Sequence, residues 1–275
     1  MTQPPGFEDP IRPHYVCKLH KSLYGLKQAP RAWYEELYHH LLSLGFIASI
    51  ANTSLFYKFD NLITFLLVYV DDIVLTGSNP HYCQYLISQL STKFSMKDLG
   101  PFSFFLGIEV TRTPSALYLS QAKYIHDLLD QTGMLDSKPC PCPTTSFKLD
   151  HTSGDLLHDP HIYWSIVGAL QYLTWTRPDI AYPVNKVCQF MHSPRSTHLA
   201  AVKRILRYLK GTPDQGLQIT KGDPILTIFT NADWGGCPID RRTTTGYCVF
   251  LGNTLLSWSA KKQPTITRSS TEAEY

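Results

Sequence analysis

Apolar residues recur at helical spacing in several stretches of this chain. In the segment APRAWYEELYHHLLSLGF, Trp33, Leu37, Leu41 and Leu44 repeat every three or four positions, which predicts an amphipathic helix. The proline near its start suits a first helical turn, and the glycine near its end suits a C-terminal cap. The same spacing predicts helices in CQYLISQLSTKF and QAKYIHDLLDQTGM, and three more around residues 163–174, 178–191 and 197–210.

A proline lies inside the second of these last three stretches. It is Pro183, in PDIAYPVNKVCQF. A proline within a helix removes a backbone hydrogen bond and costs about 3 kcal/mol unless the strain is relieved. We therefore expect the helix to bend at this position.

Alternating or continuous apolar runs predict strands elsewhere. YVCKLHKSLYGL predicts a strand that runs into a turn at Gly25, and SLFYKFDNLITFLLVYVDDIVLTG predicts two or three strands. FSFFLGIEVTRTPSALYLSQ predicts a strand pair. Near the C-terminus, ILTIFTNADW, TGYCVFLG and TLLSWSA predict three more strands, with Gly252 and Asn253 as a two-residue turn.

Between residues 138 and 160 the chain is rich in Pro, Ser, Thr, Asp and His, which is typical of a linker. The sequence therefore predicts three parts: residues 1–137, a linker with a helical part over 138–215, and a strand-rich part over 216–275. Antiparallel strand pairs and helices in separate stretches favour the α+β fold class.

The composition fits a soluble globular protein. The chain has 275 residues, 43% of them hydrophobic and 17% charged, and its net charge of +3 neither requires nor excludes a nucleic-acid partner. The longest apolar run is too short to span a bilayer and no signal peptide is apparent, so we expect a cytoplasmic or nuclear protein with no membrane partner. The seven scattered cysteines are expected to be reduced, with a metal site at Cys140 and Cys142 as the alternative.

The helix predicted around residues 197–210 carries a stripe of positive charge. Lys203, Arg207 and Lys210 follow one another at helical spacing, with Arg204 beside them. Such a stripe can neutralise about three phosphates and make binding salt-dependent. An ordinary solvated helix face is the alternative, and the sequence leaves both open.

Two adjacent carboxylates, Asp71 and Asp72, interrupt the apolar run TFLLVYVDDIVLTG. They can belong to an exposed turn, because turns favour Asp. The apolar flanks favour a bound cation instead, since neighbouring carboxylates repel each other unless a cation neutralises them. Mg²⁺ prefers oxygen ligands and bridges to phosphates, so the pair is a candidate magnesium site for phosphoryl transfer.

Several motifs together resemble the Ty1/copia group of retrotransposon polymerases. YVDD between apolar strands resembles the metal-binding hairpin of reverse transcriptases, and KSLYGLKQAPRAW resembles their segment for template and nucleotide. FLGIEV resembles their primer grip, SIVGALQYLTWTRPDIAYPVN and HLAAVKRILRYLKGT their helical connection, and the last 36 residues the start of their RNase H domain. The resemblance covers nearly the whole chain. It implies a reverse-transcriptase palm and thumb fragment over 1–137, with a palm of antiparallel sheet and helices, then a helical connection over 138–215 and a partial RNase H-like sheet over 216–275.

The resemblance also implies a reaction and the residues that serve it. The reaction is magnesium-dependent nucleotidyl transfer from deoxynucleoside triphosphates to a DNA primer on an RNA template, within a transposable-element polyprotein that also serves DNA integration. Asp71 and Asp72 would hold Mg²⁺. The implied contacts to nucleotide, template or primer are Gly25, Lys27, Gln28 and Tyr69, and the implied primer grip is Gly107 and Glu109.

The chain departs from the family pattern at both implied active sites. No aspartate here matches the family's third polymerase carboxylate, which comes from an earlier strand. In TNADWGG, Asn231 stands where the first RNase H carboxylate is expected, and Asp233 follows two residues later. Glu274 is the best match for the helix carboxylate, but its helix is not expected to close over the sheet. We therefore expect no primer extension by this chain alone. The alternatives are a catalytically dead nucleic-acid-binding remnant and a chain with no molecular role.

Overall fold

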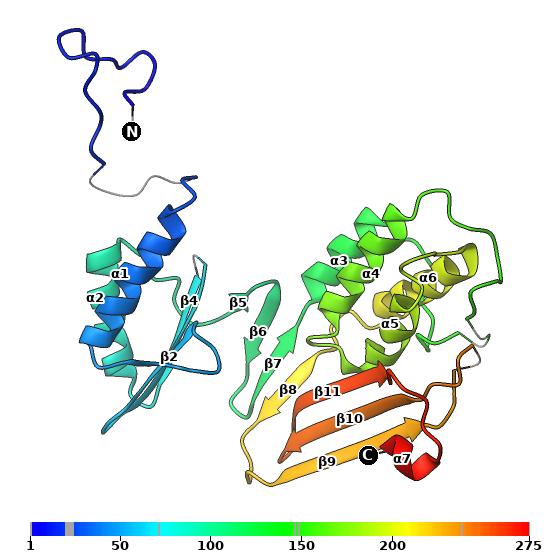
Figure 1. Ribbon diagram of the computed structural model, residues 1–275. Helices are drawn as coiled ribbons and strands as arrows, with labels where there is room; N and C mark the ends of the chain where they lie inside the picture. Colours follow the sequence, from blue (N-terminus) through cyan, green and yellow to red (C-terminus); the bar gives the residue numbers. More distant parts are fainter. Residues whose placement is uncertain are drawn as a thin grey trace. The chain divides into compact units, whose positions relative to one another are not determined.

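The structure is a computed structural model that describes residues 2–19, 25–70, 72–145, 147, 149–237 and 239–274. The chain forms two compact units, Met1–Pro101 and Phe102–Tyr275 (Figure 1). Both combine helices with antiparallel sheets, which is the predicted α+β class. The predicted domain boundaries after residues 137 and 215 concern family domains rather than compact units, and they stay predictions.

The first unit is an antiparallel sheet covered by two helices. Its strands pair in sequence order, β1-β2-β3-β4, and α1 and α2 lie on one face of the sheet. The elements are α1 (Ala29–Ser43), β1 (Ile47–Ala48), β2 (Leu55–Phe59), β3 (Ile63–Tyr69), β4 (Asp72–Gly77) and α2 (Pro80–Phe94).

The core of the first unit follows from the sequence pattern. Alternate residues of β3 are buried, Leu66 completely and Val68 to 4% exposure, and Leu37 and Leu41 of α1 pack on the same side. This arrangement confirms the predicted helix and hairpin. The strand predicted for YVCKLHK is wrong over its described part, where Val16 forms an isolated bridge to Thr2 and residues 17–19 form no strand.

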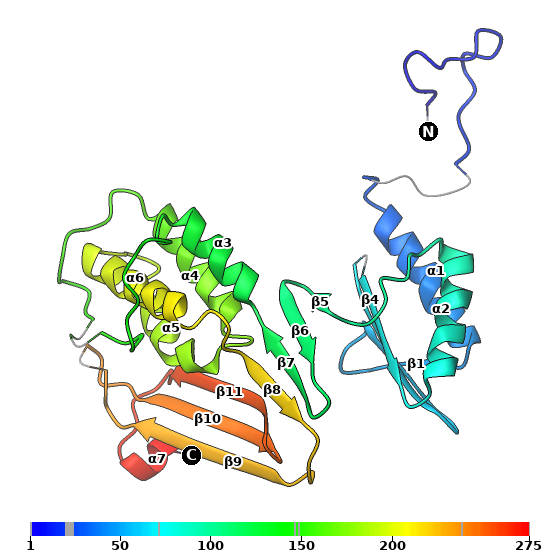
Figure 2. The same ribbon diagram turned by 180° about the vertical axis from the view of Figure 1, so that it is seen from behind.

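The second unit holds two small sheets and a bundle of helices (Figure 2). One sheet has the order β5-β6-β7-β8 and the other the order β11-β10-β9. Its elements are β5 (Phe104–Phe105), β6 (Ile108–Arg112), β7 (Ala116–Ser120), α3 (Ala122–Gln131), α4 (His161–Leu173), η1 (Pro178–Ile180), α5 (Ala181–Cys188), α6 (Ser196–Gly211), β8 (Leu217–Thr220), β9 (Leu226–Asp233), β10 (Thr244–Leu251), β11 (Thr254–Lys262) and α7 (Ser270–Glu274).

Strand β8 brings distant parts of the second unit together. It pairs with β7, so that Leu119 lies opposite Leu217, and it completes the sheet that begins with β5. The same strand contacts the other sheet, because the backbone N–H of Thr220 donates to Oγ1 of the buried Thr254 over 3.0 Å. Leu251 pairs with Thr254, which confirms the predicted two-residue turn at Gly252 and Asn253.

The bend predicted at Pro183 is wrong. The chain forms a short 3-10 helix, η1, and α5 then begins at Ala181, so Pro183 falls in the first turn of α5. The N–H groups of a first turn have no partner inside the helix, and a proline there removes no hydrogen bond. Pro183 is instead buried in the helical bundle.

A fully buried arginine ties η1 to the end of α6. Arg177, only 1% exposed, donates from Nε and Nη2 to the two carboxylate oxygens of Asp179 over 2.9 and 2.7 Å. It also donates to the carbonyl and hydroxyl oxygens of Thr212, each over 2.7 Å. Burial alone would raise the pKa of Asp179, but the hydrogen bonds and charge of Arg177 outweigh burial and lower this pKa.

A buried histidine ties the loop before α4 to the start of α6. The ring of His198 stacks on Phe190, its Nδ1 accepts the N–H of Arg195 over 3.0 Å, and its Nε2 lies 2.8 Å from the carbonyl oxygen of Asp150. This pattern fits the neutral imidazole with its proton on Nε2. Burial lowers the pKa of His198, and the positive charge of Arg195 adds to that effect.

Candidate functional site

Of the two adjacent aspartates, the structure describes Asp72, which is the first residue of β4. Tyr69, the last residue of β3, pairs with Asp72 in the strand register. Val70 has a φ of 49°, a left-handed conformation that is unfavourable for a β-branched side chain. Asp71 lies outside the residues that the structure describes.

The side chains described at this turn are open to solvent. Val70 is 69% exposed and Tyr69 49% exposed, and Asp72 is exposed as well. Among the described residues no hydrogen bond or ion pair is recorded for the Asp72 carboxylate, and no group of three His, Cys, Asp or Glu side chains gathers there or elsewhere. The Asp72 oxygens are therefore available to a cation, but the described residues do not form a complete metal site.

The segment predicted to contact nucleotide and template leads into α1. Gly25 has a φ of 89°, and Gln28 is the residue that precedes the first turn of α1 without a side-chain cap. Lys27 is exposed. Both views show the start of α1 and the start of β4 at the same end of the first unit (Figures 1 and 2). Residues 20–24, which complete the motif, lie outside the described part of the chain.

The predicted primer-grip residues have structural contacts within the second unit. Leu106 and Gly107, with φ values of 49° and 76°, form the two-residue turn between β5 and β6. A Cβ atom on Gly107 would lie 3.2 Å from the hydroxyl oxygen of Tyr172. The carboxylate of Glu109 accepts the N–H of Lys123 over 2.9 Å and so caps the start of α3.

The predicted RNase H-like residues lie on β9 and α7. Asn231 is exposed in β9, and its side-chain oxygen accepts the N–H of Ala232 over 2.8 Å. Asp233 ends the strand, and its carboxylate accepts the N–H of Thr244 on β10. Glu274 is exposed on α7. This helix contacts β9, the edge strand of its sheet, and its Ala273 is fully buried. The expectation that the helix does not close over the whole sheet stays a prediction.

The basic stripe of α6 holds the segment that precedes α4. Residues 137–142, here called the strap, run antiparallel to the helix. Lys210 donates to the carbonyl of Ser137 over 2.7 Å, and Arg207 donates to the carbonyl of residue 138 over 2.6 Å. Arg204 donates to the carbonyl of Cys142 over 3.1 Å. The stripe is thus more than a solvated face, because three of its four cations bind backbone carbonyl groups of the strap. Backbone carbonyl groups are the same in every residue, so the sequence could not predict these contacts.

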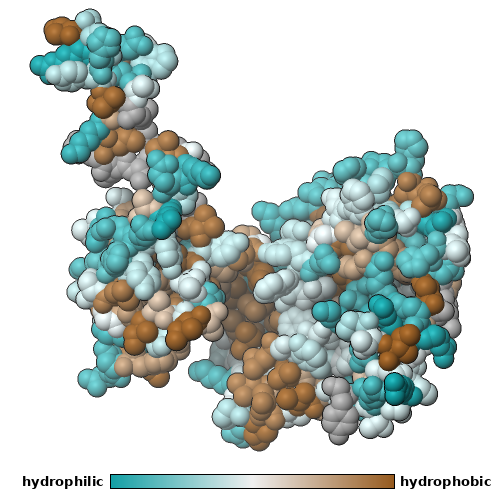
Figure 3. Space-filling view, viewed as in Figure 1, coloured by the Kyte–Doolittle hydropathy of each residue, from teal (hydrophilic) through white to brown (hydrophobic). Residues whose placement is uncertain are grey.

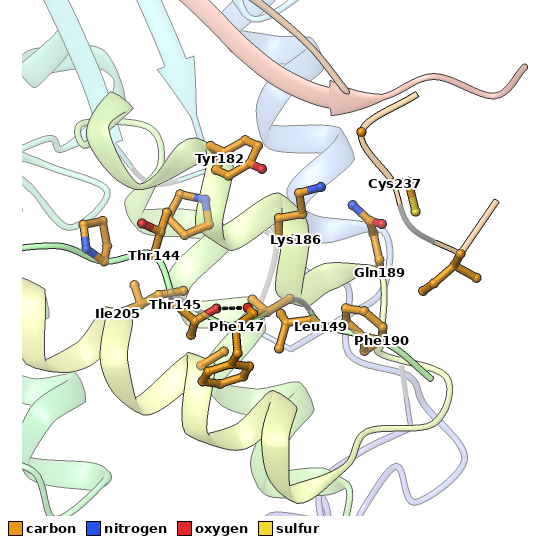
Figure 4. Close-up of a pocket in the computed structure, with 16 residues that line it drawn as sticks. Thr144, Thr145, Phe147, Leu149, Tyr182, Lys186, Gln189, Phe190, Ile205 and Cys237 are labelled. Atoms are coloured by element: carbon orange, nitrogen blue, oxygen red, sulfur yellow. Dashed lines mark hydrogen bonds between the residues drawn. The ribbon is translucent and has the colours of Figure 1, made fainter. Parts of the chain in front are cut away.

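A cavity of about 240 Å³ lies beside α5 in the second unit (Figure 4). The residues that line it include the buried Val187, Phe190 and Ile205 and the polar Lys186 and Gln189. None of the residues singled out in the sequence analysis as catalytic or nucleic-acid contacts lines it.

The comparisons with known proteins identify the family of this chain of mixed helices and antiparallel sheets. The family model described as "Reverse transcriptase (RNA-dependent DNA polymerase)" matches residues 1–146, so the chain belongs to this family. The chain is 53% identical over 278 residues to the "Retrovirus-related Pol polyprotein from transposon RE1" of Arabidopsis thaliana, which confirms the resemblance to copia-type Pol polyproteins.

Two further relatives also match the whole chain, and they differ in how much of their own length it covers. It is 39% identical over 293 residues to the Pol polyprotein from transposon TNT 1-94 of Nicotiana tabacum, and 35% identical over 282 residues to the putative transposon Ty5-1 protein of Saccharomyces cerevisiae. All of this chain is matched in the three comparisons, but it spans only 19% of the RE1 polyprotein and 22% of the TNT 1-94 polyprotein. It spans 91% of the Ty5-1 protein. No helix in the part of the chain that the structure describes is long and apolar enough to cross a bilayer.

Proposed function

We propose that this chain supplies the metal-binding hairpin of an RNA-directed DNA polymerase. This acidic hairpin is formed by β3 and β4, and its residues Asp71 and Asp72 bind Mg²⁺. The observation that carries the proposal is the position of Asp72 at the start of β4, where its side chain is exposed and no other described residue forms a hydrogen bond or ion pair with its carboxylate. A carboxylate without such a partner suits Mg²⁺, which takes oxygen ligands and keeps several waters. Bound Mg²⁺ would stabilise the charge that develops on the reacting phosphates.

The neighbouring residues would orient the substrates. Lys27 would attract a nucleotide phosphate as a point charge, and Gly25 would let the backbone approach the ligand. Tyr69 would contact the primer-template beside the reacting groups, and Gln28 would contact the nucleotide or template. RNA template, DNA primer and deoxynucleoside triphosphates are the proposed partners.

The proposal for the primer grip concerns Gly107 and Glu109. The turn that contains Gly107 would let a primer backbone approach closely. Because Glu109 already caps α3, we propose that its part in primer binding is indirect and that it keeps the β5–β6 turn fixed relative to the helix.

We also propose that β9, β10, β11 and α7 correspond to the start of an RNase H-like domain, after a connection over residues 138–215. An antiparallel three-stranded sheet followed by a helix that packs on β9 supports this assignment. The neutral amide of Asn231 attracts a divalent cation less strongly than a carboxylate would, and the Asp233 carboxylate accepts a hydrogen bond from the backbone of β10. We therefore propose that this part does not cleave RNA.

Manganese binding to the full chain tests the metal proposal. Mn²⁺ has oxygen-ligand chemistry close to that of Mg²⁺ and is detected by electron paramagnetic resonance. Asp72→Asn should weaken Mn²⁺ binding at least about tenfold, since even the loss of outer-shell partners costs ten- to hundredfold in affinity. Asp71→Asn should do the same, and Glu8→Gln, at an exposed carboxylate, is the matched control. Equal affinity of all three variants would refute the metal proposal.

Primer extension tests the catalytic part separately. The purified chain is supplied with RNA template, DNA primer, nucleotides and Mg²⁺. We expect no extension above background, because no aspartate of this chain matches the family's third polymerase carboxylate. Extension that is lost in both Asp71→Asn and Asp72→Asn would overturn this expectation and assign catalysis to the hairpin. Extension that survives either substitution excludes these carboxylates from the reaction.

A further inference from the structure

Two cysteines lie close together on the strap. Cys140 and Cys142 are separated by Pro141, where the chain bends, and the sulfur of Cys140 lies 3.4 Å from the carbonyl oxygen of Cys142. Residues two positions apart span at most about 7 Å between their Cα atoms, and a disulfide bridges Cα atoms up to about 6.8 Å apart. Because the bend shortens that span, the two sulfurs can be joined within the strap.

The two thiols have different surroundings. Cys142 is exposed, and its sulfur lies 2.9 Å from the hydroxyl oxygen of Thr144. Hydrogen bonds with the side chain and the backbone of Thr144 lower the pKa of Cys142, and the positive charge of Arg204 adds to this effect. Cys140 is half-buried, and its thiol donates to the carbonyl oxygens of Cys142 and Arg204, each over 3.4 Å. Cys142 is therefore the more accessible nucleophile, with a second thiol beside it.

The surface around Cys142 carries positive charge that no carboxylate offsets. Arg204 of the basic stripe donates to the carbonyl of Cys142, and this neutral acceptor leaves the guanidinium charge uncancelled. No ion pair within 4.0 Å joins the four cations of the stripe to a carboxylate in the described part of the chain. The strap has no acidic residue and adds the exposed Lys138. A small molecule that carries carboxylates is therefore attracted toward Cys142.

We propose that Cys140 and Cys142 form a dithiol site that reduces small disulfides carrying carboxylates, of which glutathione disulfide is an example. The Cys142 thiolate attacks one sulfur of the substrate and bonds to it, the S–S bond of the substrate breaks, and one small thiolate leaves and takes a proton from water. Cys140 then loses its proton to water and attacks the Cys142 sulfur, which forms the disulfide within the strap and releases the second small thiol. The two cysteines lose two electrons, and the substrate gains them.

Oxidation would also change how the strap is held. In the disulfide neither sulfur carries a hydrogen, so the Cys140 thiol no longer donates to the carbonyls of Cys142 and Arg204. The N–H of Cys140 still donates to the carbonyl of Arg207. The dithiol site shares no residue with the acidic hairpin, so it goes beyond the proposed polymerase site and can fail independently of it.

Mass spectrometry of the full chain tests the dithiol site. The reduced protein is treated with glutathione disulfide in EDTA at neutral pH, and N-ethylmaleimide then blocks the remaining thiols. The tryptic peptide over residues 124–148 holds Cys140 and Cys142 and no other cysteine. At the end of the reaction we expect this peptide to have lost two hydrogens and to carry neither maleimide nor glutathione. A peptide that keeps both thiols, or that retains glutathione, would overturn the inference.

Single substitutions assign the two roles. Cys140→Ser should stop the reaction at the mixed disulfide on Cys142, and Cys142→Ser should slow the reaction of the peptide about tenfold or more, because the remaining thiol is half-buried. Thr144→Val keeps the shape of the side chain without its hydroxyl and should slow the first step about two- to threefold. Cys17→Ser, at an exposed cysteine of the first unit, is the matched control. Equal rates for Cys142→Ser and Cys17→Ser would overturn the inference.

A comparison of two disulfides tests the part played by charge. Glutathione disulfide carries carboxylates, whereas 2-hydroxyethyl disulfide is uncharged. Raising the salt concentration from 50 to 200 mM should slow the first reaction more than the second, because salt screens the attraction between exposed charges. Equal slowing of both reactions would overturn the preference for an anionic substrate.

Discussion

The buried Arg177 offers a sharp test of what holds the second unit together. Arg177→Met keeps an apolar stem of similar length and removes the charge and all four hydrogen bonds. The Asp179 carboxylate then loses its cationic partner, and the Thr212 carbonyl loses its donor. Tyr208 still donates to Asp179 over 2.8 Å, so the carboxylate keeps one hydrogen bond.

The expected loss of stability is about 3 kcal/mol. Removing one partner of a buried ion pair costs about 3–5 kcal/mol, because a charge is left in the interior without compensation. The Asp179 side chain is 31% exposed, so water can solvate part of it and the lower end of that range applies.

Urea unfolding followed by tryptophan fluorescence measures this loss. Four of the five tryptophans lie in the second unit, so the signal reports mainly on it. With a typical urea dependence of about 2 kcal/mol per molar, the midpoint should fall by about 1.5 M. Arg112→Met makes the same side-chain change at an exposed position of the same unit and should leave the midpoint unchanged.

A double-mutant cycle isolates the ion pair itself. Asp179→Asn alone should also destabilise the unit, because Arg177 would then be the buried charge without a partner. The double variant should lose less stability than the sum of the single variants by at least about 1 kcal/mol. Additive losses, or a midpoint shift below about 0.5 M for Arg177→Met, would refute the account of this network.

Three further predictions follow from features of the fold. Because burial lowers the pKa of His198, the histidine takes up a proton at a higher pH in the unfolded chain than in the folded one. The free energy of unfolding of the second unit should therefore be highest above about pH 6.5 and fall as the pH is lowered. His198→Gln should reduce the change in urea midpoint between pH 7.5 and 5.5. Val70→Gly should stabilise the first unit by about 1 kcal/mol, because relief of about 1–3 kcal/mol of backbone strain exceeds the entropy cost of glycine. Slower amide hydrogen exchange in β3 and β4 would show this stabilisation, and faster exchange would contradict it. Glu109→Ala should cost about 1 kcal/mol through loss of the α3 cap at Lys123, whereas Glu109→Gln should keep most of it; equal midpoints for the two variants would exclude capping.

The helices and hairpins could be predicted because each presents a periodic apolar face to a core. Leu37 and Leu41 mark α1 in this way, and alternate residues do so for β3. Pro183 was misplaced for a physical reason. The apolar spacing predicted a single helix across η1 and α5. Because α5 begins only at Ala181, Pro183 lies in its first turn, where a proline removes no backbone hydrogen bond.

The contacts of the candidate site residues could be predicted less well. The turn before Asp72 follows from local sequence, but the bond from Lys123 to Glu109 joins residues 14 positions apart across a hairpin. The partners of Arg204 and Arg207 are backbone carbonyls, which every residue carries and no residue type reveals. Local periodicity therefore locates elements, whereas tertiary packing decides what their polar side chains bind.

Exposed apolar side chains gather at the start of β9 and in the segment before it, including Ile225, Leu226 and Phe229 at 65, 61 and 62% exposure (Figure 3). Single apolar residues are common on protein surfaces, but a contiguous group marks an interaction or aggregation surface. Variants that destabilise the second unit are therefore best compared at low protein concentration.

Strand β7 is synthesised well before β8, the strand with which it pairs. Ser120 leaves the ribosome about a hundred residues before Leu217, a delay of roughly 5–20 s at 5–20 residues per second. Throughout that interval one edge of β7 has no strand beside it, and such an edge can recruit other nascent chains. A stalled or prematurely terminated translation product that lacks β8 would retain this open edge, and it is the form of the protein that cellular chaperones would need to hold.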